Sequence, residues 1–180
     1  MTRFVSPIAV VAAAVCLSVA CSGPGPSAAP EQRTIADSAE QVLYNGRMMI
    51  ASNGVRRGEA SGTAVYSLDA ATRFHFRPLS VQLVTPLGRP LSVLTASDGT
   101  YSLARPILET GGPVTVTSDT TGRKLTGTAV RYDPATNQLA SDSAFTATAG
   151  TRRLTGVGFT ADPGLFTIRC LQRCSGSLGR

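Results

Sequence analysis

The chain has 180 residues, of which 42% are hydrophobic and 16% are charged, a balance that supports one packed domain and excludes wholesale disorder. Its formal net charge of +6 would suit nucleic acid, an anionic lipid or an acidic glycolipid. The basic residues form scattered pairs at Arg56-Arg57, Arg123-Lys124 and Arg152-Arg153, without a zinc-finger, helix-turn-helix or RNP-like pattern. We therefore expect these pairs in solvated turns and no nucleic-acid partner.

Residues 1–21 read as a leader. Arg3 precedes an apolar run over residues 4–20, and Cys21 follows. A positive start, an apolar stretch and small residues before a cleavage point are typical of a secretory signal. The end of the leader, LSVAC, resembles a bacterial lipobox, although Ser18 stands where leucine is usual. We expect lipidation at Cys21 and a membrane-anchored, exported protein; an ordinary cleaved signal and an uncleaved single span are the alternatives.

Residues 22–38 are rich in proline, glycine and serine, and they lack an apolar period. This composition predicts a disordered tether. Near its end, Asp37 and Glu40 have the spacing of a capping box, which could open one short helix. The domain is expected over residues 39–180.

From about residue 40 the sequence changes to short runs of β-branched and aromatic residues. Residues 73–77 (RFHFR) alternate strictly, so that Phe74 and Phe76 share one face of a strand. The same alternation recurs at residues 80–83, 114–117 and 145–148. Turn pairs such as Asn53-Gly54 and Asp133-Pro134 separate these runs. The pattern predicts an all-β domain of antiparallel strands.

A repeat lies within this pattern. Residues 125–134 (LTGTAVRYDP) parallel residues 154–163 (LTGVGFTADP), and looser copies occupy residues 94–101 and 59–66. Each copy predicts a strand that ends at a turn and is followed by a second strand. Such self-similarity is typical of stacked hairpins that each need neighbours to bury their apolar face, although a Thr- and Gly-rich chain produces some matches by chance.

These repeats resemble the OstA-like fold of the LptC/OstA-like family of lipopolysaccharide-export proteins, over about residues 40–179. The resemblance implies a twisted, antiparallel β-jelly roll of repeated hairpins, with an apolar inner trough for lipopolysaccharide acyl chains. It also implies that open strand edges pair with an ABC-type permease and with a periplasmic bridge protein. A periplasmic location with an inner-membrane anchor follows from the same likeness. The family's membrane-attached member usually keeps an uncleaved membrane helix, whereas this leader looks cleavable.

The resemblance implies two groups of lipid-contacting residues, for which the alternatives are ordinary core packing and a solvated strand face. Arg73 and Arg77 flank the first aromatic pair and are candidates for contact with lipid head-group phosphates. The candidates for the acyl-chain trough are Tyr66, Phe74, Phe76, Val81, Leu83, Tyr101, Val114, Val116, Tyr132, Phe145 and Phe159. The competing interpretation of the whole protein is a structural or interaction lipoprotein with a closed β-core and no lipid ligand.

Two cysteines near the end, Cys170 and Cys174, form a C-x₃-C pair. In an oxidising compartment this pair favours a disulfide across the turn of the final hairpin, because a metal site would need further ligands and His75 is the only histidine. The chain lacks a nucleophile elbow, a paired-carboxylate motif and a phosphate or dinucleotide loop. We expect no enzymatic activity, no metal and no cofactor.

Overall fold

The computed structural model describes residues 34–179, so Cys21, the leader and most of the tether lie outside the described residues. One 3-10 helix precedes the strands. The elements in chain order are η1 (Ile35–Ser38), β1 (Gln41–Ser52), β2 (Val55–Leu68), β3 (Arg73–Arg77), β4 (Leu79–Val84), β5 (Pro90–Ser102), β6 (Ile107–Ser118), β7 (Lys124–Thr128), β8 (Arg131–Asp133), β9 (Gln138–Ala149), β10 (Arg152–Ala161) and β11 (Ile168–Gly176).

The end of the predicted tether is ordered. The capping box consists of Thr34 and Asp37, with the Thr34 backbone N–H donating to Asp37 Oδ2 at 2.8 Å. The helix that it opens ends at Ser38, so the predicted capping pair of Asp37 and Glu40 is wrong by one turn. Glu40 instead accepts a hydrogen bond from the backbone N–H of Ala70.

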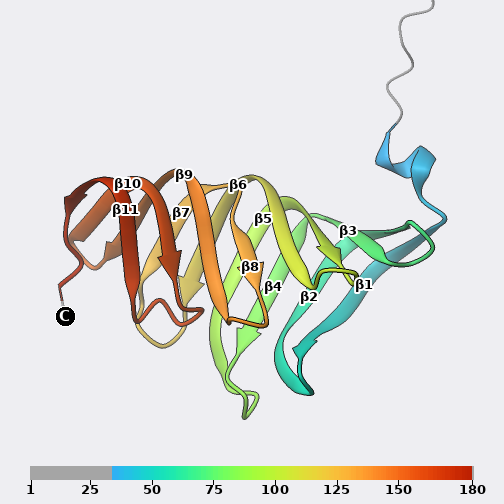
Figure 1. The fold of residues 1–180 in the computed structure, drawn as a ribbon, viewed down its shortest axis with the longest axis horizontal. Helices are drawn as coiled ribbons and strands as arrows, with labels where there is room; N and C mark the ends of the chain where they lie inside the picture. The colour runs from blue at the N-terminus through green and yellow to red at the C-terminus, as the bar shows by residue number, and fades with distance from the viewer. Residues whose placement is uncertain (1–33, 180) are drawn as a thin grey trace, which may run out of the picture. The chain divides into compact units, whose positions relative to one another are not determined.

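The strands form one 11-stranded antiparallel sheet, which confirms the all-β prediction. The order is β1-β2-β3-β5-β6-β7-β9-β10-β11, with β4 between β2 and β5 and β8 between β6 and β9. The sheet folds over on itself, because β2, β5, β6 and β9 each pair with different neighbours along their two halves. We call the half that contains β4 and β7 the first layer, and the half that contains β3 and β8 the second layer. The strands arch from one layer to the other along the upper side of Figure 1.

The arch is built from backbone irregularities. Asn45, Gly112, Ala129, Gly158 and Arg173 all have positive φ values, between 50° and 72°, and all lie where a strand, or the β7–β8 connection, passes between layers. Such residues break the alternation of side chains and bend a strand. The inward-facing residues therefore change from even to odd numbers, or the reverse, along several strands.

Inward side chains from adjacent strands form continuous apolar rows. One row in the first layer runs through Ala60, Val81, Leu94, Val116, Leu125 and Ala147, each in register with the next. A row in the second layer runs through Tyr101, Leu108, Tyr132 and Leu139. All these residues are at most 3% exposed. Full burial of one such large side chain contributes about 1.5–3 kcal/mol, so the two rows account for a large part of the stability.

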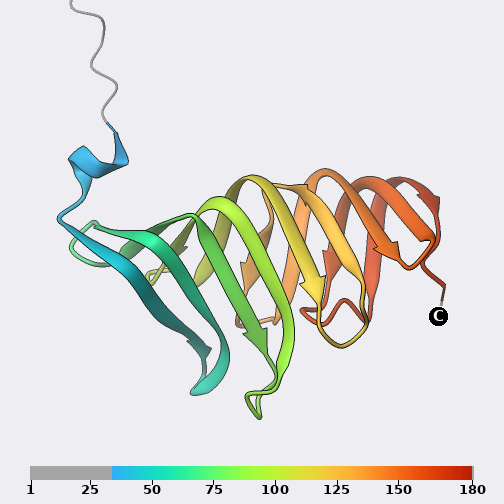
Figure 2. The ribbon, with the colours of Figure 1, turned by 180° about the vertical axis from the view of Figure 1, so that it is seen from behind.

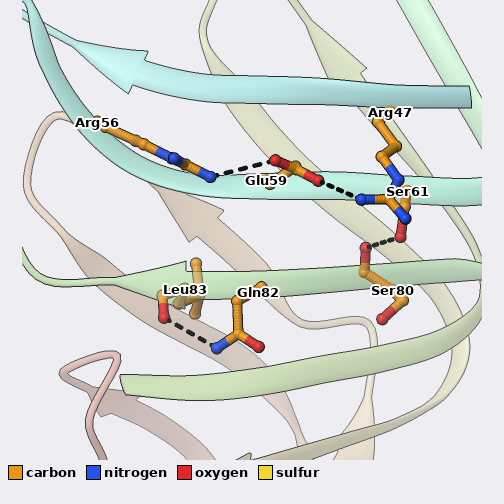
Figure 3. A network of polar contacts seen from close by, with 7 residues as sticks. All are labelled: Arg47, Arg56, Glu59, Ser61, Ser80, Gln82 and Leu83. Atoms are coloured by element: carbon orange, nitrogen blue, oxygen red, sulfur yellow. Dashed lines mark hydrogen bonds and ion pairs between the residues drawn. The ribbon is translucent and has the colours of Figure 1, made fainter. Parts of the chain in front are cut away.

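The outer face of the first layer explains the high content of serine and threonine. Cross-strand register aligns one hydroxyl row across it, consisting of Ser61, Ser80, Thr95, Thr115, Thr126, Thr146, Thr155 and Ser175. Some of these hydroxyls donate to a neighbouring strand, such as Ser61 Oγ to the Ser80 carbonyl at 3.3 Å. Figure 3 shows this contact beside Glu59, which pairs with Arg47 and Arg56 on the same face.

Candidate functional site

Most of the trough candidates lie on the inner faces of the two layers. Every trough candidate except Tyr66 and Phe74 is at most 4% exposed and lies in the core: Phe76, Val81, Leu83, Tyr101, Val114, Val116, Tyr132, Phe145 and Phe159. Phe74 is half-buried and packs against this core. The structure therefore brings these candidates together on the inner faces, where they fill the space between the layers with their own side chains.

Tyr66 does not belong to this set. Through β4, the register aligns Leu94 with Ala60 rather than with Glu59, so the copy at residues 59–66 is one residue out of phase with the copy at residues 94–101. Tyr66 consequently lies on the outer face, with its ring centroid 6.2 Å from that of His75. The repeat predicted an inward tyrosine because it matched Tyr66 to Tyr101, whereas the residue that aligns with Tyr101 through Phe74 is Ser67.

The glycines of the two LTG motifs make room for an aromatic residue. Gly127 and Gly156 both pair with Phe145 on neighbouring strands, and a Cβ atom at Gly156 would lie 3.2 Å from the Phe145 ring. Phe145 in turn packs against Phe159 across the interior, with ring centroids 5.1 Å apart and an interplanar angle of 55°. The repeated motif thus places a large side chain over two glycines.

Residues 162–167, which we call the closing loop, connect the two layers on the side away from the arch. Ser92 of β5 donates a hydrogen bond to the Pro163 carbonyl, and Ser118 of β6 donates to the Gly164 carbonyl at 2.7 Å. The side chain of Leu165 is fully buried in the core. The repeat predicted a turn at the end of the copy at residues 154–163 but not this contact with the first layer.

Arg123 secures the closing loop. Its guanidinium donates to the carbonyl oxygens of Leu165, at 2.9 Å, and of Phe166, at 2.7 Å. Within the loop, the Asp162 carboxylate accepts hydrogen bonds from the backbone N–H groups of Gly164 and Phe166. Asp133 accepts an equivalent bond from Ala135 at the corresponding turn of the other copy. The loop is therefore ordered both by its own turn and by a cation from the opposite layer.

Arg73 and Arg77 lie on the face of β3 opposite to Phe74 and Phe76. Arg73 forms an exposed ion pair with Asp69 at 3.0 Å. The structure does not bring the head-group candidates together with the trough residues on one face.

His75 lies between the two arginines and is 6% exposed. Its Nδ1 lies 3.0 Å from the Thr100 hydroxyl, and its Nε2 is buried without a hydrogen-bond partner among residues 34–179. Burial lowers the pKa of His75 from its ordinary value of 6.5; Asp98 opposes this effect, whereas Arg77 and Arg73 add to it. Burial thus favours the neutral form of this ring on the outer face.

Cys170 and Cys174 form a disulfide with a Cα–Cα distance of 6.0 Å. Both residues lie within β11, on either side of the positive-φ residue Arg173, so the expected position across a hairpin turn is wrong. The bulge at Arg173 shortens the path between the two cysteines enough for bonding. Cys170 packs against the core above Gly156, where a Cβ atom would collide with its sulfur. The disulfide therefore lies at the β11 end of the core, with Cys170 packed against it and Cys174 exposed.

Among the residues that the structure describes, β1 and β11 each pair with one strand only, so they form the two edges of the sheet, and they lie at opposite ends of the domain in Figures 1 and 2. The β1 edge carries exposed apolar side chains at Leu43, Tyr44 and Met49, and the β11 edge carries one at Leu171. An edge strand with exposed apolar side chains can accept a further strand.

Residues 34–179 contain no cluster of potential metal ligands. In the same range, no helix has the length and apolarity needed to cross a membrane. Neither the protein-family models nor the curated proteins give a match to this chain.

Proposed function

We propose that the protein is a non-enzymatic periplasmic component of a lipopolysaccharide-export bridge with an OstA-like jelly-roll fold. In this role it binds lipopolysaccharide acyl chains between its two layers and passes the lipid from an inner-membrane ABC permease to a periplasmic bridge protein. The lipidated Cys21 anchors it to the inner membrane. The observation that carries the proposal is a folded-over sheet whose inner face is apolar from β1 to β11 and whose two ends are free edges.

Strand addition at these edges supports the proposed partners. The backbone groups on the outer side of β1 and β11 have no neighbour within the sheet. A partner strand at either edge would extend both the hydrogen-bonded ladder and the apolar inner face into the next protein. The exposed Leu43, Tyr44 and Met49 would add apolar burial to the contact at β1.

An acyl chain must part the layers, because core side chains occupy the space between them. Burial of lipid methylenes contributes about 0.8 kcal/mol each, so a chain of about twelve gains roughly 10 kcal/mol. This gain is of the same order as the total stability of a domain. Exchange of side-chain contacts for lipid contacts is therefore energetically feasible, with the closing loop and Arg123 as the contacts to be released.

Photocrosslinking in cells tests the proposal. A photoreactive residue at Phe145 or Phe74 should capture lipopolysaccharide, whereas the same residue at Tyr66, on the outer face, should not. Protein level and export are checked by immunoblot of the same samples. The proposal fails if the inner positions capture no lipid in stably expressed protein, or if Tyr66 captures it equally.

The second candidate is an interaction lipoprotein of the envelope with a closed core. The near-complete burial of the inner residues favours it. In that case the inner positions capture no lipid, and probes at Leu43 or Leu171 capture only protein partners.

A further inference from the structure

The β-bulge in β2 turns one arginine toward the interior. The register with β1 shifts at Ile50, and this shift leaves Arg57 without a partner. Arg56 and Glu59 are paired on the outer face at 3.1 Å (Figure 3). The two residues between them, Arg57 and Gly58, therefore both lie on the inner face, where Ile50 is fully buried. The prediction of a solvated turn at Arg56-Arg57 is wrong, because both residues lie within β2 and only Arg56 is exposed.

Arg57 has no anionic partner within residues 34–179, whereas Arg47 and Arg56 share Glu59. Its Nε is shielded from solvent and lacks a hydrogen-bond acceptor in that range. A shielded guanidinium N–H without an acceptor is unfavourable, because its desolvation is not compensated. The residue as a whole is only partly buried, and of its nitrogens only Nε is both shielded and unpaired, so the guanidinium lies close to the surface.

Arg57 also bears electrostatically on the second layer. Burial raises the pKa of Tyr132 on β8, and the positive charge of Arg57 acts against this rise. The Tyr132 hydroxyl donates to Asn137 Oδ1 at 3.0 Å. Arg57 thus lies beside the apolar interior, near the turn between β1 and β2.

We infer that Arg57 binds the anionic head of an amphiphile, a phosphate or a carboxylate, whose apolar chain lies between the layers. A guanidinium binds either group through paired, charge-assisted hydrogen bonds, and its shielded Nε would then gain an acceptor. The position near the surface leaves the rest of the head group in water while the chain enters the core. This inference rests on the proposed function and assigns the anion contact to Arg57 rather than to Arg73 and Arg77.

Calorimetric titration of the purified, exported protein tests the inference with three probes: dodecyl phosphate, dodecanol and inorganic phosphate. Wild type should bind dodecyl phosphate more tightly than dodecanol, and inorganic phosphate far more weakly than either. Arg57→Gln should weaken dodecyl phosphate binding by roughly 10- to 100-fold, the loss expected for charge-assisted hydrogen bonds, without changing dodecanol binding. The matched control is Arg56→Gln, which removes the same charge from the outer face and should leave all three affinities unchanged.

The outcomes separate the two proposals. If wild type binds neither dodecyl compound, the proposed function fails together with the inference. If it binds both and Arg57→Gln behaves as Arg56→Gln does, the lipid-binding function stands and the inference fails. If inorganic phosphate binds as tightly as dodecyl phosphate, the inference also fails, because Arg57 would then belong to a site for free phosphate. Arg57→Lys keeps the positive charge but lacks the planar guanidinium, so it should cause a smaller loss of dodecyl phosphate affinity than Arg57→Gln. It replaces Arg57→Gln in the test if the glutamine variant does not fold.

Discussion

Truncation of Phe159 measures how tightly the interior is packed. This side chain is fully buried, and its ring packs at a tilt against that of Phe145, with ring centroids 5.1 Å apart. Phe159→Ala therefore removes a large apolar surface and leaves a cavity between the layers. Such truncations in packed cores cost about 3–5 kcal/mol. For a domain of this size, that loss corresponds to a fall in Tm of roughly 10–15 °C.

Urea unfolding followed by circular dichroism gives the change in the free energy of unfolding, with the disulfide kept oxidised in both proteins. Tyr66→Ala is the matched control, because Tyr66 is an aromatic residue on the outer face and only half-buried; we expect it to cost about 1 kcal/mol. A cost below about 1 kcal/mol for Phe159→Ala would refute the packed interior and indicate an open slot at this position in the free protein.

Four further results are expected. Gly156→Ala should lower the Tm, because the new methyl group would collide with the sulfur of Cys170; an unchanged melting curve would contradict this packing. Reduction of the bond between Cys170 and Cys174 should cost about 2 kcal/mol, since it closes a short loop, and both thiols should resist labelling in denaturant until they are reduced. Because burial lowers the pKa of His75, this residue binds a proton more readily in the unfolded chain than in the folded protein. The free energy of unfolding should therefore fall as the pH drops below 6.5. His75→Gln should remove this part of the pH dependence, as measured by unfolding at several pH values. Cys21→Ala should move the protein into the soluble fraction, and continued membrane association would exclude lipidation as the sole anchor.

The regular parts of the strands could be predicted from the sequence, because alternation depends only on local pattern. Phe76 is inside and Arg77 is outside, as the alternation of residues 73–77 predicts. The repeat also identified a true equivalence, since Leu125 and Leu154 align in the sheet through Ala147.

The irregular crossings between layers could not be predicted in the same way. A bulge changes the direction of every later side chain, and it depends on tertiary contacts of the backbone rather than on a residue type. Arg57 was therefore placed outside, on the wrong face. Tyr66 was placed inside because its copy of the repeat was aligned one residue out of phase. The C-x₃-C spacing indicated a disulfide, but a positive-φ arginine within a strand gives no sequence signal for its position.

The placement of the disulfide gives the two ends of the domain different resistance to local opening. Strands at the ends of a sheet have a neighbour on one side only and exchange their amide protons first. At β11 the covalent bond and the packed Cys170 oppose such fraying, whereas β1 has no crosslink among its residues. Amide exchange should therefore proceed inward from the β1–β2 hairpin, so that the end beside Arg57 is the first to separate and the opposite end is the last.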